Sequence, residues 1–186
     1  MITSLELKRQ LLHIFFGVFI VCMLYFKIFN IYHLIVILIL GLTLSKLCLH
    51  FRIPVASWVM DRFERSEYRK TFPGKGPIFF MIGSIIVVHF FSLQTALASI
   101  LILSLGDGLS HIFGKLLSRK DYKHLKSIEG TLIAIVLSFF GAMIFVSSFA
   151  AFFGTISSLL LENLKIPFID DNLFIPIVAA LVISAF

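Results

Sequence analysis

An aspartate beside a long apolar run is the residue that first indicates chemistry in this sequence. Ser110, His111 and Gly114 follow Asp107 at offsets of three, four and seven, so they share one face with it if the helix continues. A carboxylate near a membrane interior is costly unless it is paired or hydrated, and it therefore marks a functional site by default. The alternative roles for Asp107 are a helix cap and an interhelical ion pair.

Charged residues continue through the same polar segment up to the next apolar run. Within residues 126–130, Lys126 can act as a point charge on phosphate, and Glu129 can hold magnesium that bridges phosphate oxygens. This combination predicts a site for a nucleotide or a lipid phosphate. The segment is not a P-loop, because Leu116 stands after Lys115 where a magnesium-binding Ser or Thr would be required.

Glycines surround the aspartate and have two plausible roles. Gly106, Gly108 and Gly114 could let a phosphate or a neighbouring backbone approach closely. Small residues equally serve plain helix packing in membranes. The sequence favours neither role over the other.

Three further polar clusters lie beside other apolar runs. They contain Arg9 with His13, Lys75 within residues 73–77, and residues 170–172. Each has a structural alternative, namely snorkelling side chains, a turn before a helix that starts with proline, and a helix cap. All three clusters, like Asp107, fall on the same side of the membrane in the topology predicted below. This convergence indicates a common site.

The composition identifies the elements that must position these residues. Of the 186 residues, 59% are hydrophobic and 14% are charged, and the mean hydropathy is +1.04. Apolar runs of about 16–20 residues are near the length of a membrane-spanning helix. Cys22 and Cys48 have no CxxC spacing, so the sequence indicates neither a disulfide framework nor a zinc site. We expect one all-α, polytopic membrane domain over residues 1–186.

Seven spans are expected, and the charges orient them. Their residues are 11–28, 31–49, 77–92, 94–113, 131–145, 148–161 and 173–186. Of the sixteen Lys and Arg residues, all except Lys27 then fall on one side, together with all ten acids. The positive-inside rule puts that side and the N-terminus in the cytoplasm. The basic residues lie beside the spans, so topology and lipid head groups explain them better than a nucleic-acid partner does. Residues 57–65 alternate apolar and charged positions, which suggests a short interfacial helix.

In order, these motifs resemble the family of small membrane enzymes that contains dolichol kinases, phytol kinases and yeast-type CTP-dependent diacylglycerol kinases. The matching elements are residues 9–13 (Arg-Lys-x-x-His in the family), 73–76 (Pro-Gly-Lys-Gly), 106–114 (Gly-Asp-x-x-Ala-x-x-x-Gly), 126–130 (Lys-Thr-x-Glu-Gly), and Glu162 with 171–176 (closing acidic elements). The chain departs from the pattern at Gln10, Ser110 and Ser127, where the family has Lys, Ala and Thr.

The resemblance implies transfer of the CTP γ-phosphoryl group to the hydroxyl of a membrane lipid alcohol at the cytoplasmic interface. Phosphoryl transfer depends mainly on positioning and charge neutralisation, which suits such a cluster. Asp107, Glu129 and Asp171 are implied as catalytic acids and Mg²⁺ ligands. The implied nucleotide and phosphate contacts are Arg9, His13, Lys75, Gly106, Gly108, Gly114, Lys126, Ser127, Gly130 and Asn172, with Glu162 as a further acid. The membrane would be the plasma membrane of a prokaryote or the endoplasmic reticulum of a eukaryote.

Two other functions stay open on the sequence alone. A phosphatidate-type cytidylyltransferase resembles this family in its acidic and Lys-x-x-Glu-Gly region, and it would release pyrophosphate from CTP. A transporter without catalysis would distribute charge through the membrane depth, whereas the charges here stop at one interface. The sequence selects neither the lipid alcohol nor the oligomeric state.

Overall fold

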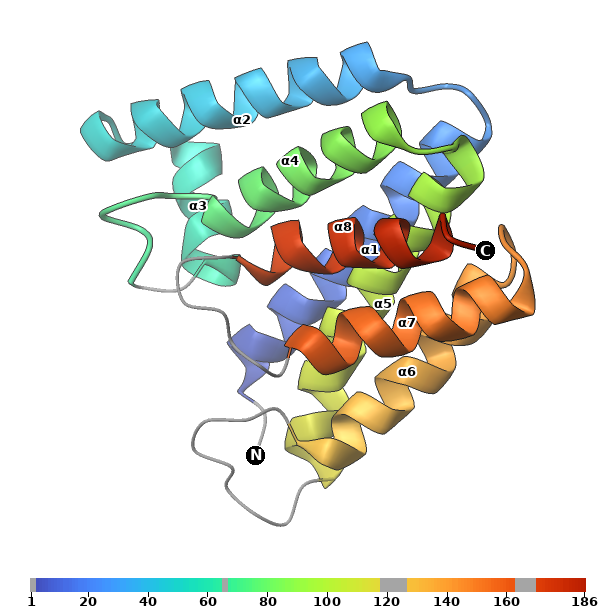
Figure 1. Cartoon of the computed structure of the whole chain (residues 1–186). Coiled ribbons are helices and arrows are strands. Elements are labelled where there is room, and N and C mark those ends of the chain that lie inside the picture. The colour runs from blue at the N-terminus through green and yellow to red at the C-terminus, as the bar shows by residue number, and fades with distance from the viewer. Residues whose placement is uncertain (1–2, 65–66, 118–126, 163–169) are drawn as a thin grey trace.

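The structure is a computed structural model that describes residues 3–64, 67–117, 127–162 and 170–186. Within these ranges the chain forms helices and no strand (Figure 1). The eight helices are α1 (Ser4–Tyr25), α2 (Ile31–His50), α3 (Pro54–Phe63), α4 (Lys75–Phe90), α5 (Leu93–Leu117), α6 (Ile128–Ala142), α7 (Ser148–Glu162) and α8 (Asp171–Ile183). The expected all-α class is confirmed for this part of the chain.

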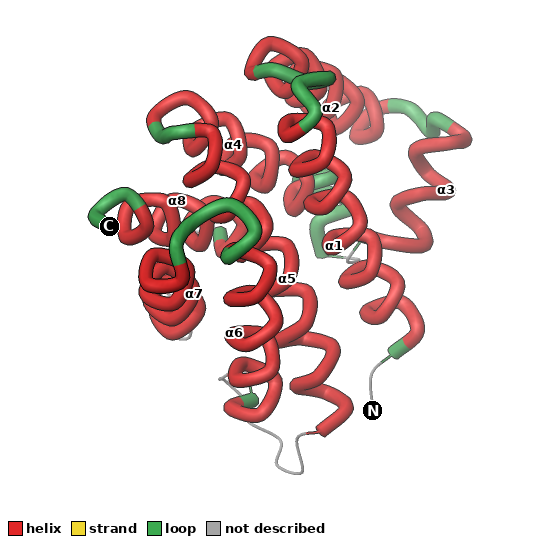
Figure 2. Tube along the Cα trace, turned by 90° about the vertical axis from the view of Figure 1, so that its right-hand side faces the viewer, coloured by secondary structure: helices red, strands yellow, loops and turns green. Residues whose placement is uncertain are grey.

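Helix α5 forms the centre of the bundle. It contacts α1, α4, α6, α7 and α8, and Figure 2 shows it between α1 on one side and α7 and α8 on the other. Ala96, Ile100 and Leu103 have no exposed surface. A helix that is apolar on all sides is stable only when other apolar surfaces surround it. Asp107 therefore lies on the most enclosed helix of the molecule.

Three helices, α1, α2 and α5, are long and apolar enough to cross a membrane. Helix α2 packs against α4 and α3, yet it leaves large side chains such as Ile39 and Leu40 more than half exposed. A continuous exposed apolar surface of this kind is unusual on soluble proteins. These features indicate a membrane protein. Helices α4, α6, α7 and α8 are also apolar but shorter.

Every expected span is helical, but the first helix begins earlier than predicted. Helix α1 starts at Ser4 instead of residue 11, because the Thr3 hydroxyl accepts a hydrogen bond from the Glu6 amide (3.3 Å) and caps the helix. Glu6 then pairs with Arg9 inside the helix. Arg9 and His13 consequently lie within α1 and not at its entrance.

The polar ends of three other helices have local causes. Gly74 has φ of +75° directly before α4, a conformation that residues with a Cβ rarely adopt. The Ser127 hydroxyl caps α6 by accepting from the Gly130 amide at 3.1 Å. The Asp170 carboxylate caps α8 by accepting from the Asn172 amide at 3.2 Å. These features fix where α4, α6 and α8 start, and they keep the polar residues of the sequence motifs next to those helix starts.

The expected short helix is present as α3, three residues earlier than its predicted start. Its exposed Val55 and Trp58 are apolar, and the Arg62 guanidinium lies over the Trp58 ring at 4.8 Å. Pro54 at its first turn favours the start of a helix.

The bundle has two different ends. In Figure 1 the loops between α1 and α2, α4 and α5, and α6 and α7 lie on one side with the C-terminus. The starts of α4, α6 and α8 and the end of α5 lie on the other side. Among the described residues, all Asp and Glu belong to this second end, which we call the charged end, and Lys27 is the one Lys or Arg at the first.

Candidate functional site

The first turns of α1 present a buried carboxylate to two neighbours on the same helix. Arg9 Nη2 lies 2.6 Å from Glu6 Oε1, and Gln10 Nε2 donates to the same oxygen at 3.2 Å. Offsets of three and four residues bring these side chains onto one helical face. Glu6 is 8% exposed and Gln10 is 2% exposed, so the group is held inside the protein. Lys115 and His111 of α5 are close enough to interact electrostatically with Glu6.

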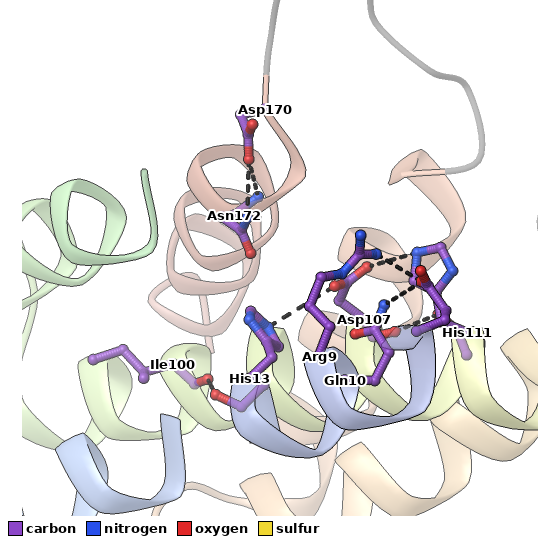
Figure 3. Close-up of polar contacts among 11 residues, drawn as sticks. Arg9, Gln10, His13, Ile100, Asp107, His111, Asp170 and Asn172 are labelled. Atoms are coloured by element: carbon purple, nitrogen blue, oxygen red, sulfur yellow. Dashed lines mark hydrogen bonds and ion pairs between the residues drawn. The ribbon is translucent and has the colours of Figure 1, made fainter. Parts of the chain in front are cut away.

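Asp107 of α5 lies between two histidines (Figure 3). His111 Nε2 is 3.4 Å from Asp107 Oδ1, and His13 Nε2 of α1 is 3.9 Å from Asp107 Oδ2. The Asp107 side chain is 14% exposed. The predicted shared face of Asp107, Ser110 and His111 is confirmed, since the Ser110 hydroxyl donates to the Asp107 carbonyl at 2.9 Å. A carboxylate held between imidazoles can accept or hold a proton.

A second ion pair joins α4 to the start of α8. Lys75 Nζ lies 3.4 Å from Asp170 Oδ2, and it also lies 4.8 Å from the centre of the Tyr68 ring. Asp170 is occupied on its other oxygen, which accepts from the Asn172 side-chain amide at 3.0 Å. The Lys75 ammonium is thus held at the charged end, between the Asp170 carboxylate and the face of the Tyr68 ring.

The loop that carries Lys75 is anchored by side chains on both sides. Glu64 Oε2 accepts from the Gly74 amide at 2.9 Å, and the Ser45 hydroxyl of α2 donates to the Pro73 carbonyl at 2.6 Å. These bonds satisfy backbone groups that would otherwise be buried without partners. They hold the loop against α2 and α3.

Asn172 brings an unpaired hydrogen-bond acceptor to the same end. Its side-chain Oδ1 is buried and has no hydrogen-bond partner among the described residues. Its backbone carbonyl receives no helical bond from Pro176, which has no N–H. Buried acceptors are normally paired, so an unpaired one needs an explanation such as a ligand or water.

The group around Asp107 and the group around Asp170 both adjoin α4. Gly76 and Gly83 face Asn172, because a Cβ at Gly76 would lie 3.8 Å from Asn172 Nδ2 and one at Gly83 would lie 2.7 Å from Asn172 O. Phe80 lies between these glycines at helical spacing, and its ring meets the His13 ring edge to face at 5.4 Å. His13 and Asn172 therefore flank the same stretch of α4.

The glycines predicted to make room for a phosphate lie at helix contacts. An added Cβ at Gly106 would meet Leu159 at 2.5 Å, and one at Gly108 would meet Ile14 at 2.4 Å. One at Gly130 would lie 2.5 Å from the Gly114 amide nitrogen of α5, while Gly114 itself faces the Ser127 hydroxyl. These distances show close helix packing at all four glycines, which is one of the two roles that the sequence left open for Gly106, Gly108 and Gly114.

The three acids predicted to bind magnesium form no metal-binding group among the described residues. Glu129 and Asp171 are exposed, whereas Asp107 is enclosed by histidines. In the part of the chain that the structure describes, no group of three or more His, Cys, Asp and Glu side chains could hold a metal ion. Of the three acids, only Asp107 is enclosed at the charged end, and Mg²⁺ in nucleotide sites is held by one or two carboxylates together with substrate phosphates.

Two predicted residues cannot be placed. Lys126 lies outside the described residues, and Glu162 ends α7 with a side chain that also lies outside them. Two residues that the site uses, Glu6 and His111, had no predicted role in it, while Asp170 was predicted only as a member of the cluster at residues 170–172. The offsets of three and four residues from Glu6 to Arg9 and Gln10, and of four from Asp107 to His111, could have predicted contacts on one helix face. The contact between Lys75 and Asp170 could not be predicted in this way, because 95 positions of sequence separate the two residues.

Comparison with known proteins identifies a relative but no activity. No family model matches the chain, and no solved structure is significantly similar to it. An uncharacterized protein of Methanocaldococcus jannaschii, MJ1137, is 31% identical over 181 residues, which cover 96% of this chain and 93% of that protein. Similarity at this level over nearly the full length of both chains reflects a shared family. The chain belongs to the same protein family as MJ1137.

Proposed function

We propose that the protein is a CTP-dependent lipid-alcohol kinase of the polyprenol kinase type. It would transfer the γ-phosphate of CTP to the hydroxyl of a membrane lipid such as dolichol, another polyprenol, phytol, geranylgeraniol or diacylglycerol. The observation that supports this most is the enclosed Asp107, which lies between His13 and His111 at the charged end of an apolar bundle. The ordered motifs from residues 9 to 176 supply the resemblance to the kinase family.

The proposed reaction needs a proton acceptor and cations at one place. The alcohol oxygen forms a bond to the γ-phosphorus while the bond from that phosphorus to the β–γ bridging oxygen breaks, and CDP leaves with the electron pair. Asp107 accepts the hydroxyl proton, and the adjacent imidazoles orient its carboxylate. Lys75 and Arg9 bind phosphate oxygens and neutralise their charge.

Magnesium is proposed as the cofactor, and it would enter the charged end bound to the phosphates of CTP. Mg²⁺ carried on the nucleotide would neutralise charge on the transferring phosphate. Glu6 keeps Arg9 in position through the 2.6 Å ion pair, so that the guanidinium is oriented before the nucleotide arrives. The unpaired Asn172 Oδ1 offers an acceptor to a donor group of the nucleotide or the alcohol.

The proposed topology has seven spans, with the N-terminus and the charged end in the cytoplasm, where CTP is available. The exposed apolar sides of α1 and α2 would contact lipid tails, and the alcohol hydroxyl would reach the charged end at the membrane interface. The membrane is the plasma membrane in a prokaryote or the endoplasmic reticulum in a eukaryote.

The test incubates purified protein in detergent with Mg²⁺, a panel of lipid alcohols plus phosphatidate, and CTP labelled on the α- or the γ-phosphate. The kinase proposal predicts γ-label in a lipid and release of CDP. Entry of α-label into phosphatidate with release of pyrophosphate would replace the proposal with a cytidylyltransferase. Uptake of a solute into proteoliposomes without any nucleotide turnover would favour a transporter.

A further inference from the structure

The end of the bundle opposite the charged end contains a hollow of about 430 Å³. It lies where the loop between α1 and α2 meets the end of α4 and the start of α5. Its polar lining comes from Lys27, Asn30 and His89, and its apolar lining includes Leu24 and Val88. None of these residues belongs to the proposed kinase site.

The hollow is electropositive and has no acidic partner. Lys27 makes no ion pair within the described residues, and no Asp or Glu of the described chain lies at this end. Ile31 and Leu93, the first residues of α2 and α5, also line the hollow. Helix N-termini carry positive partial charge, so they add to the potential of the lysine.

Lys27 occupies a backbone position that favours glycine. It has φ of +57°, and it is the one described residue other than glycine with a positive φ. The Lys27 amide donates to the Leu24 carbonyl and the Ile28 amide donates to the Met23 carbonyl, which is the bonding pattern of a helix end closed by glycine. A lysine at this unfavourable position is explained if its side chain has a use.

Exposed aromatic residues put the hollow at the level of lipid head groups. Tyr25, Phe26, Tyr32 and Phe90 flank it and are each more than half exposed. Tyrosines collect at the boundary between hydrocarbon and water, where the ring is apolar and the hydroxyl is wet. A lipid phosphate at this depth would meet the Lys27 ammonium, while its acyl chains would follow the apolar surface.

We propose that this hollow binds the phosphate head group of an anionic membrane lipid. The inference uses the shape, the charge and the position of the hollow, and it is independent of the proposed kinase activity. Lys27 supplies the main attraction for the phosphate, and His89 and Asn30 supply further hydrogen-bond donors. Within the described chain the Asn30 side-chain Nδ2 donates no hydrogen bond: the side chain uses its oxygen to cap α2, and the backbone N–H donates to His33 Nδ1.

The test measures lipid binding to delipidated protein in a neutral detergent. Native mass spectrometry and the midpoint of thermal unfolding are recorded with phosphatidylglycerol, with phosphatidylcholine of the same acyl chains, and with inorganic phosphate. Wild-type protein should bind and be stabilised by phosphatidylglycerol in preference to phosphatidylcholine. Lys27→Gln should weaken the binding of phosphatidylglycerol about fivefold, as expected for one lysine near a membrane surface.

A second variant separates the role of the side chain from that of the backbone. Lys27→Gly should raise the unfolding midpoint without lipid, because glycine suits the positive φ, and should still lose the preference for phosphatidylglycerol. Lys46→Gln, an exposed lysine in α2 at the other end of the bundle, is the matched control and should bind like wild type. Equal stabilisation by both lipids, equal losses in Lys27→Gln and Lys46→Gln, or the same effect from inorganic phosphate alone would each overturn the proposal.

Discussion

Lys75 contacts both a carboxylate and an aromatic ring, and this makes its proposed role testable. If Lys75 binds nucleotide phosphate, Lys75→Met should raise the KM for CTP about tenfold or more, as for loss of a hydrogen bond to a charged group. If Lys75 only holds Asp170 in place, Asp170→Asn should cause the same change. We expect Asp170→Asn to change the KM for CTP much less, because it leaves the lysine free to reach the phosphate.

The control for this prediction is Lys46→Met. Lys46 is an exposed lysine on α2 that makes no ion pair among the described residues. Steady-state kinetics at saturating lipid should show a KM for CTP close to that of wild type. A KM raised equally by Lys46→Met and Lys75→Met would mean that general surface charge, and not a specific contact, binds the nucleotide.

Several site residues could be predicted from the sequence because their chemistry is unusual in an apolar chain. Asp107, His13 and Lys75 were predicted and do belong to the charged end. The prediction of Glu129 and Asp171 as partners of Asp107 stays a prediction: both side chains are exposed, and the described residues contain no metal-binding group that joins them. Sequence spacing cannot show which of two adjacent acids, Asp170 or Asp171, faces the protein. Here Asp170 does so, because its carboxylate caps α8 and pairs with Lys75.

At the scale of whole elements, the crossing of α5 and α6 at Gly130 brings two helix backbones into close contact near the site. Any Cβ at Gly130 would lie 2.5 Å from both the Gly114 amide nitrogen and the Ser110 carbonyl oxygen, and backbone atoms cannot move aside easily. Gly130→Ala should therefore destabilise the protein by about 1–3 kcal/mol, as for overpacking in a core. The midpoint of thermal unfolding in detergent measures this effect.

Gly41 of α2 provides the matched control, because a Cβ there would meet nothing within 4 Å. Gly41→Ala should leave stability unchanged or increase it by about 0.5–1 kcal/mol, through the better helix propensity of alanine. If Gly130→Ala proved as stable as Gly41→Ala, the close approach of α5 and α6 would be disproved.

The helices themselves could largely be predicted, whereas their ends could not. Seven apolar runs and the short helix near residue 57 are all helical. The early start of α1 depends on Thr3 and on the contacts of Glu6 with Arg9 and Gln10, which hydropathy does not detect. Side-chain contacts of this kind determine helix ends, so boundaries are less predictable than the helices.

At the scale of the whole molecule, the separation of charge between the two ends predicts the orientation in the membrane. Single cysteines in a background without Cys22 and Cys48 can test this in intact cells. Gln94→Cys, at the start of α5, should react with a maleimide that does not cross membranes, and Lys70→Cys should react only after the cells are opened. The reverse pattern would put the charged end outside and remove the access to CTP that the kinase requires.

The arrangement of helices around α5 is the part of the fold that the sequence did not reveal. Several helices are almost uniformly apolar, so hydropathy does not indicate which sides touch. The close contacts of Gly17 with Ser104 and of Gly83 with Asn172 determine how α1 and α8 sit against their neighbours. Such contacts join residues that are far apart in sequence, and only the three-dimensional structure reveals them.

The most direct test of the central claim compares wild-type protein, Asp107→Asn and Asp61→Asn in one assay of label transfer from γ-labelled CTP to a lipid alcohol. Asp61 is the control, because it is an exposed carboxylate paired with Arg69 away from the two histidines. We predict that Asp107→Asn lowers the rate at least about 100-fold, as for loss of a general base, with unchanged membrane insertion. Asp61→Asn should keep the wild-type rate. An Asp107→Asn protein that phosphorylates lipid at the wild-type rate would contradict the claim that this carboxylate is the centre of the reaction.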